Sequence, residues 1–378
     1  MTAGLRVLLF RAIYAVALGG AVAWMVLVLE AAAAAGTLGY DYRAYDLAVD
    51  RLVAGRPLYD TTADVIGGFG LFLYPPPFAL LVAPITLLPG DLGIGVWTAL
   101  LLAATLAAVA LMPVSGRVQL AVLLLAALSW PVLYAIKLGQ VGPLLLLLFA
   151  VGWRWMDRPW PLGVSAAFGA AIKLQPALVL GWAVLTGRLR AAVIGLVCFA
   201  LLAVVATLVA GSNAWFEELD LLARTNQPIL TPHAYGVGRL LFEAGVPESM
   251  AMIANLANLA AVAAVTLFAI LRASAVASYL AVAVASQFIS PVLWDHYAVI
   301  LLLPTAWLLN RGQRWAALIP LATSNLLISV TPPATYPIAF WVALLAVTWE
   351  GVRDRRGDRA GMRLRAQGKR EIDVSSLA

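Results

Sequence analysis

Charged residues are scarce in this chain of 378 residues: they make up 12% of it, whereas 63% of the residues are hydrophobic. Soluble domains average about 25% charged and about 45–50% apolar residues. The mean hydropathy is +0.93, and so much apolar surface cannot be buried in one water-soluble core. The composition therefore excludes a cytosolic enzyme and predicts an all-α, polytopic integral membrane protein.

Side chains that bind metals or form cross-links are also few. The sequence holds one cysteine, Cys198, and two histidines, so it can form no disulfide within the chain and offers no Cys/His metal cluster. No Cys/His metal site is therefore expected, and the sequence indicates no cofactor. The net charge of +6 does not indicate a nucleic-acid partner, because residues 353–370, with eight Arg or Lys and two Asp, account for the whole excess.

Long apolar runs predict about twelve membrane-spanning helices in a single domain over residues 1–352. Two polar connections, at about residues 36–75 and 212–248, are expected to be long external loops, and residues 42–54 to form a short helix along the membrane surface. Lys and Arg gather in cytoplasmic loops. Their distribution places the basic segment 353–378 in the cytoplasm as a disordered tail, and both loops outside the cell inner (plasma) membrane. The runs lie at roughly residues 7–29, 76–89, 93–112, 118–136, 139–156, 162–186, 190–211, 249–271, 274–290, 296–309, 313–330 and 336–352.

Ionisable side chains inside apolar sequence are costly in a membrane and are functional candidates. The chain has three lysines, and two of them lie in apolar surroundings, in Lys137-Leu-Gly-Gln140 and Lys173-Leu-Gln175-Pro176. Each segment combines a cation with an amide and a residue that breaks helices. One interpretation is that these lysines contact a phosphate or pyrophosphate, aided by backbone N–H groups freed at the helix break. The alternative is a lysine at the interface that reaches the lipid headgroups.

Two further polar segments border the predicted spans. Asp41 lies among aromatic residues, Tyr45 included, shortly after the first span. It could be a general base at the membrane surface, or a solvated carboxylate within an aromatic belt. Asp295 and His296 follow Trp294 between two apolar runs. They could orient a phosphate or a hydroxyl, although Asp295 could also cap the helix that follows.

A proline-rich segment marks the return of the chain to the membrane after the first loop. It reads Tyr74-Pro75-Pro76-Pro77. Because proline is tolerated in the first turn of a helix and stiffens the end of a loop, we interpret this segment as structural.

Several short motifs follow one another along the chain. They are Asp41-Tyr42-x-x-Tyr45, Ala54-Gly55-Arg56-Pro57-Leu58-Tyr59, Tyr74-Pro75-Pro76, Gly139-Gln140, Lys173-Leu174-Gln175-Pro176, Asn226-Gln227 with Arg239 downstream, and Ser290-Pro291-x-x-Trp294-x-His296. In that order and spacing, over about residues 37–310, they resemble glycosyltransferase family 87, the DUF2029 group. This family includes membrane mannosyltransferases that use polyprenyl-phosphate mannose, and an arabinofuranosyltransferase.

The resemblance implies a GT-C-like fold with its active site on the outer face. It implies a polyprenyl-phosphate-linked sugar donor, a lipid or glycan acceptor, transfer with inversion and no metal. The family's catalytic Asp corresponds to Asp41, and its Lys before a proline to Lys173. The same substrate site is expected to include Tyr45, Lys137, Gln140, Gln175, Asn226, Gln227, Arg239, Trp294 and His296.

This sequence departs from the family pattern at two places. Pro228 follows Gln227 where members often have Ser, which puts acceptor contacts of that loop in doubt. Tyr297 stands where a second His often follows His296.

The chemistry of such a transfer suits the residues present. Asp41 can take the proton of an acceptor hydroxyl, and Lys173, Arg239 or His296 can stabilise the departing phosphate. The resemblance implies a mannosyltransferase-like enzyme, with a pentose as the alternative sugar. The competing interpretations are a transporter or lipid flippase without chemistry, against which the absence of an internal repeat argues, and a different GT-C-type lipid-linked transferase. The sequence leaves the sugar, the acceptor and the linkage open.

Overall fold

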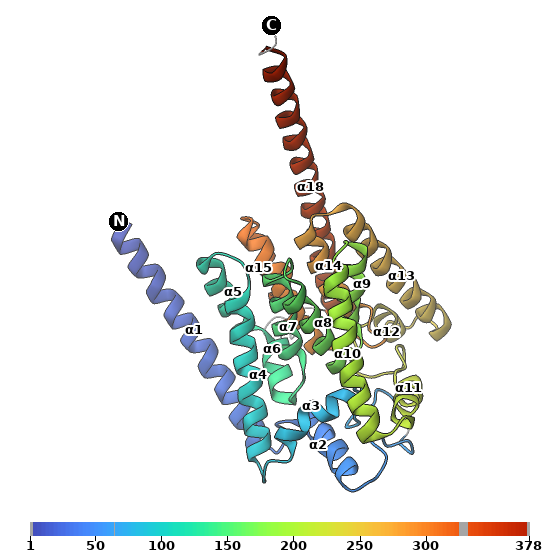
Figure 1. Ribbon diagram of the computed structural model, residues 1–378. Helices are drawn as coiled ribbons and strands as arrows, with labels where there is room; N and C mark the ends of the chain where they lie inside the picture. Colours follow the sequence, from blue (N-terminus) through green and yellow to red (C-terminus); the bar gives the residue numbers. More distant parts are fainter. Residues whose placement is uncertain (1–2, 64, 325–331, 376–378) are drawn as a thin grey trace.

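Helices form the regular structure of this chain (Figure 1). The computed structural model describes residues 3–63, 65–324 and 332–375, and no β-strand occurs in these ranges. The start of α1 (Ala3–Ala34) and the C-terminal part of α18 (Thr335–Ser375) point to the same end of the bundle. The opposite end carries α2 (Tyr40–Val53), α3 (Pro76–Thr86) and α11 (Asn213–Thr225).

Within the described residues, five helices are long and apolar enough to cross a membrane. Twenty helical residues rise about 30 Å, which matches the hydrocarbon thickness of a bilayer. The multi-pass membrane character predicted from composition is thus confirmed. A sixth span is possible if α5 (Gly116–Leu128) and α6 (Trp130–Leu138) count together, but the pair is bent by 60°. The five segments are Arg11–Ala34 in α1, Leu92–Leu111 (α4), Leu189–Ala210 (α10), Glu248–Arg272 (α13) and Thr335–Gly357 in α18.

The prediction of about twelve spans is not confirmed, because the other apolar runs form short or broken helices. The predicted span 296–309 begins as the 3₁₀ helix η2 (Asp295–Leu301) before α15 (Leu302–Asn310). The predicted span 313–330 forms η3 (Arg314–Ala317) and α16 (Leu318–Ala322), and its last part lies outside the described residues. Five apolar helices in the described part of the chain have 10–17 residues: α3, α7 (Gly142–Arg154), α8 (Pro159–Ile172), η1 (Gln175–Ala177) joined to α9 (Leu178–Leu185), and α14 (Ala275–Phe288).

Proline explains two of these breaks. Pro176 lacks an N–H group and cannot pair with the carbonyl of Ile172. Helix α8 ends at Ile172, and Lys173 is extended, with φ −154° and ψ 134°. Pro131 likewise follows an extended Ser129, with φ −80° and ψ 116°, between α5 and α6. The run 162–186, expected as one span, is therefore divided at Lys173.

The two segments expected as long loops contain helices. The first holds α2, where a short helix was predicted, and the second holds α11 and α12 (Val237–Glu243). Backbone N–H of Gly67 donates to the carbonyl of Thr225 at 2.8 Å. The guanidinium of Arg224 donates to the carbonyls of Thr61 and Ala63 at 3.1 and 3.0 Å. The two segments therefore pack on each other at one end of the bundle.

The basic segment after residue 352 was expected to be a disordered tail. In the structure, α18 continues through it as a helix to Ser375. Arg311, just after α15, donates to both carboxylate oxygens of Asp354 at 2.9 and 2.5 Å. This bidentate pair joins the first turns of the basic segment to the bundle.

Candidate active site

A backbone hydrogen bond ties the start of α2 to the end of α6. The N–H of Gly39 donates to the carbonyl of Lys137 at 2.7 Å. Gly39 has a φ of 70° and Gly139, which ends α6, a φ of 76°. This left-handed region favours glycine. The two turns place Asp41, in the first turn of α2, beside Gln140.

Asp41 is held by a side-chain amide. Nε2 of Gln140 donates to Oδ2 of Asp41 at 2.6 Å. Burial raises the pKa of Asp41, whereas the charge of His296, the hydrogen bond from Gln140 and the charge of Lys173 oppose that rise. A half-buried carboxylate near the ammonium group of Lys173 is suited to accept a proton from a hydroxyl.

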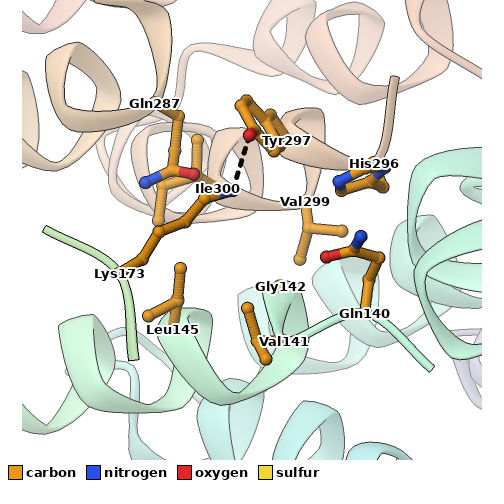
Figure 2. A pocket seen from close by; sticks show the side chains of 10 residues that line it. All are labelled: Gln140, Val141, Gly142, Leu145, Lys173, Gln287, His296, Tyr297, Val299 and Ile300. Atoms are coloured by element: carbon orange, nitrogen blue, oxygen red, sulfur yellow. Dashed lines mark hydrogen bonds between the residues drawn. The ribbon is translucent and has the colours of Figure 1, made fainter. Parts of the chain in front are cut away.

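A pocket lies beside this pair, and Figure 2 shows the side chains around it. They come from the α6–α7 connection and α7, from the break after α8, from α14 and from η2. An apolar wall with a few converging polar groups is the usual form of a ligand site. The polar residues are Gln140, Lys173, Gln287, His296 and Tyr297, and the others are Val141, Gly142, Leu145, Val299 and Ile300.

The break after α8 turns Lys173 into this pocket. Its Nζ donates to the hydroxyl of Tyr297 at 2.6 Å and lies 3.8 Å from the centroid of that ring (Figure 2). None of the ion pairs found in the described residues includes Lys173. An ammonium group without a carboxylate partner favours the binding of an anion. Lys173 is therefore open to an anion in this pocket, and its contact with a donor phosphate stays a prediction.

His296 lies on the opposite wall and is 5% exposed. Its ring is parallel to that of Trp294 within 10°, with the centroids 6.4 Å apart. Nδ1 lies 3.4 Å from Oδ1 of Asp295, which also accepts a hydrogen bond from the backbone N–H of His296 at 2.8 Å. Neither ring nitrogen has a hydrogen-bond partner among the described residues. Buried polar groups are normally paired, so this imidazole is available to a ligand.

The comparison with protein families decides the class of this chain. The model of glycosyltransferase family 87 matches residues 72–294, more than half of the chain. The chain belongs to glycosyltransferase family 87. It is therefore a glycosyltransferase, rather than a transporter or flippase without chemistry.

Two curated proteins of Mycobacterium tuberculosis are similar to this family 87 enzyme. The polyprenol-phosphate-mannose-dependent alpha-(1-2)-phosphatidylinositol mannoside mannosyltransferase of strain ATCC 25618 / H37Rv is 28% identical over 320 residues, which cover 75% of each chain. The corresponding phosphatidylinositol pentamannoside mannosyltransferase of strain CDC 1551 / Oshkosh is 28% identical over 261 residues, 64% of this chain and 59% of that relative. No solved structure matches the chain.

Several residues predicted for the site of the family 87 enzyme do not line the pocket. The Nζ of Lys137 lies 5.7 Å from the ring centroid of Tyr134. The guanidinium of Arg239 pairs with Glu243, one turn later in α12, at 2.7 Å. It also donates to the carbonyl of Ile229 at 3.0 Å, so it is engaged within its own segment. Binding roles stay predictions for Lys137, Gln175, Asn226, Gln227, Arg239, Trp294 and Tyr45.

The pocket and the contacts of Gln140 include residues that the sequence interpretation missed. Gln287 is a buried amide of α14 that lines the pocket, and its Nε2 donates to Oγ of Ser286 at 3.1 Å. The sequence did hold a signal for Gln287, because its amide side chain lies within a continuous apolar run. Tyr74, interpreted as structural, donates from its hydroxyl to Oε1 of Gln140 at 2.8 Å. No spacing rule links residues 66 positions apart, so the sequence offered no signal for this contact.

Proposed function

We propose that this glycosyltransferase moves mannose from polyprenyl-phosphate mannose to a lipid acceptor of the phosphatidylinositol mannoside class. The names of the two mycobacterial relatives specify this donor and this acceptor class. The observation that carries the proposal is the position of Asp41, bound to Gln140, beside a pocket lined by Lys173 and His296. A base and a phosphate-binding group are the two things that such a transfer requires.

In the proposed mechanism, each of these side chains has one role in the substitution at the anomeric carbon. Asp41 takes the proton of the acceptor hydroxyl while the acceptor oxygen bonds to that carbon. The bond from the carbon to the phosphate oxygen breaks, and its electron pair stays on the phosphate. Lys173 and His296 stabilise the charge that develops there. Attack from the side opposite the leaving phosphate inverts the configuration of the sugar.

The same proposal places the active site on the outer face of the plasma membrane. Helix α2 with Asp41 lies at the end of the bundle away from the C-terminal part of α18 (Figure 1). That part of α18 carries Arg353, Arg355 and Arg356, and basic segments of this kind stay in the cytoplasm. In this arrangement the short and broken apolar helices also cross the membrane, which gives a GT-C-like architecture of about twelve segments. Their apolar surface accommodates the polyprenyl tail.

A transfer assay tests the proposed function. Purified protein in detergent is mixed with polyprenyl-phosphate mannose and a phosphatidylinositol mannoside, and the lipids are separated by chromatography. We expect a mannosylated product and an equal amount of polyprenyl phosphate. Polyprenyl-phosphate glucose and arabinose serve as parallel donors. Preferential use of the pentose would contradict the choice of sugar, and failure to consume any of the three would contradict the donor class.

Lys173→Gln should reduce kcat/KM for the donor by about tenfold or more, since a charge-assisted contact contributes about 1.5–3 kcal/mol. Glutamine keeps roughly the length of the side chain and removes its charge. Lys173→Arg should restore only part of the activity, because the planar guanidinium group of Arg does not replace the compact ammonium group of Lys. Initial rates over a range of donor concentrations give the measurement.

Lys137→Gln is the informative comparison for that variant. Both lysines precede an amide in similar sequence, but Lys137 lies against Tyr134 and outside the pocket. A larger loss in the Lys137 variant than in the Lys173 variant would show that this pocket does not hold the donor phosphate.

A further inference from the structure

Four buried or half-buried side chains form a continuous hydrogen-bonded chain that ends on Asp41. The hydroxyl of Tyr45 donates to the hydroxyl of Tyr74 at 3.0 Å. The hydroxyl of Tyr74 donates to Oε1 of Gln140 at 2.8 Å, and Nε2 of Gln140 donates to Oδ2 of Asp41 at 2.6 Å. Tyr45, Tyr74 and Gln140 are 0%, 7% and 9% exposed, so water does not interrupt the chain.

The direction of this chain follows from the chemistry of its ends. An ionised carboxylate only accepts hydrogen bonds, so Gln140 must turn its NH₂ group toward Asp41. Its carbonyl oxygen then faces Tyr74, which must donate. The oxygen of Tyr74 is thereby free to accept from Tyr45, and every group in the chain has a partner.

The opposite direction leaves one buried group without a partner. If Asp41 were protonated and donated to a flipped Gln140 amide, Tyr74 would accept from Gln140 and donate to Tyr45. The hydroxyl hydrogen of Tyr45 would then need another acceptor. Tyr45 is fully buried, and its hydroxyl contacts no partner except Tyr74 in the part of the chain that the structure describes. A buried donor without an acceptor is costly, so Tyr45 disfavours the reversed chain.

We propose that Tyr74, oriented by Tyr45, is a positioning residue that fixes the amide of Gln140 and so favours the ionised state of Asp41 that a base requires. This inference rests on the proposed function, in which Asp41 accepts the proton of the acceptor. Tyr74 touches neither substrate nor the reacting atoms and acts only through Gln140. It gives the Tyr-Pro-Pro-Pro segment a role beyond starting α3.

Other charged or titratable groups also act on Asp41 and set the background for this effect. His296 and Lys173 favour its ionised form, whereas Asp295 disfavours it. Its own charge acts in turn on Tyr45, Tyr74 and Tyr134. His296, Lys173, Asp295, Tyr45 and Tyr134 all remain when the hydroxyl of Tyr74 is removed. A single Tyr74→Phe replacement therefore tests the hydrogen-bonded series of side chains by itself.

The pH dependence of transfer tests the proposal with Tyr74→Phe. The acidic limb of the kcat/KM profile should move to higher pH by about 0.5–1 unit. Activity below the midpoint should fall about three- to tenfold, and activity on the alkaline plateau should change much less. Tyr45→Phe should shift the limb in the same direction by a smaller amount, because Tyr74 can still donate to Gln140.

Tyr59→Phe is the matched control. The hydroxyl of Tyr59 donates to the backbone carbonyl of Tyr74 at 2.7 Å, and Tyr59 is 1% exposed. This variant loses a buried hydrogen bond to Tyr74 but keeps the hydrogen bonds that run from Tyr45 to Asp41. It should therefore melt at a lower temperature, while the acidic limb of its kcat/KM profile stays where it is in the wild type. An equal shift in Tyr59→Phe would mean that Tyr74→Phe acts through general loosening.

The activity of Asp41→Asn shows whether a negative result contradicts the positioning role of Tyr74 or the proposed function itself. If Asp41→Asn is inactive and the limb of Tyr74→Phe does not move, Asp41 is the base and the positioning role is wrong. If Asp41→Asn stays active, the base itself is misassigned. Should Tyr74→Phe fail to fold, the profile of Tyr45→Phe decides the question, and an unmoved limb there overturns the proposal.

Discussion

Asp41→Asn is expected to lower transfer by about 10²–10⁴-fold, the usual contribution of a general base. Asparagine has nearly the same shape, and its side-chain oxygen can still accept the hydrogen bond from Gln140. The fold and the pocket should therefore survive, while the group that takes the proton is lost. Single-turnover transfer with saturating donor and acceptor gives the measurement, because it reports the chemical step alone.

Asp50→Asn provides the control for that result. Asp50 lies on the same helix but is exposed, so the same substitution there should leave the rate unchanged. If Asp41→Asn retained more than a few per cent of the rate, which would be too much for a lost base, Asp41 would not be the base and Asp46 would be the next candidate. The family match begins at residue 72, after Asp41, so this variant is an independent test of the role given to Asp41.

In the wild-type protein, ionisation of Glu218 should lower the free energy of unfolding by about 3 kcal/mol as the pH rises, and Glu218→Gln should remove this loss. Glu218 lies in α11 and is 2% exposed, and its Oε1 has no hydrogen-bond partner in the described residues. Burial raises its pKa from the ordinary value of 4.5 to about 7. The folded protein holds this proton more tightly than the unfolded chain does. Protonation of Glu218 therefore contributes fully to the free energy of unfolding below about pH 4.5, and this contribution disappears as the pH rises through about 7.

Thermal unfolding in detergent between pH 5 and 8 measures this effect. The wild-type protein should lose more stability than Glu218→Gln as the pH rises, since the variant has no charge to bury. Both proteins must be heated at one scan rate, because unfolding of membrane proteins is often irreversible. Glu217→Gln, which alters the adjacent and partly exposed carboxylate, should follow the wild-type pH dependence. Parallel curves for the wild type and the Glu218 variant would show that Glu218 titrates normally.

The sequence predicted the class of fold but not the length of its helices. Continuous apolar runs are enough to identify α4, α10 and α13 as spans. Hydropathy does not register the hydrogen bonds lost at Pro131 and Pro176, so two apolar runs that looked continuous are divided. Too many spans were predicted for the same reason: an apolar run that is broken by a turn has the same hydropathy as an unbroken helix.

The candidate site was predictable where a residue was chemically out of place. Lys173 and His296 stand out in apolar sequence, and both line the pocket. Lys137 has almost the same local sequence as Lys173, and only the conformation of the chain separates them: Lys137 ends a helix, whereas Lys173 is extended in a break. Tyr74 could not be found in this way, because its role depends on a contact across 66 positions of sequence.

The hydrogen bond from Gly39 to the carbonyl of Lys137 has a consequence for how the enzyme responds to its lipid environment. Changes in bilayer thickness tilt or bend membrane helices, and the 60° bend between α5 and α6 is a natural place for such movement. Because the start of α2 is bound to the end of α6 at 2.7 Å, Asp41 and Gln140 would be carried together when α6 tilts. The contact between base and amide would then be insensitive to membranes of different thickness, while the depth of the pair relative to the headgroups would change.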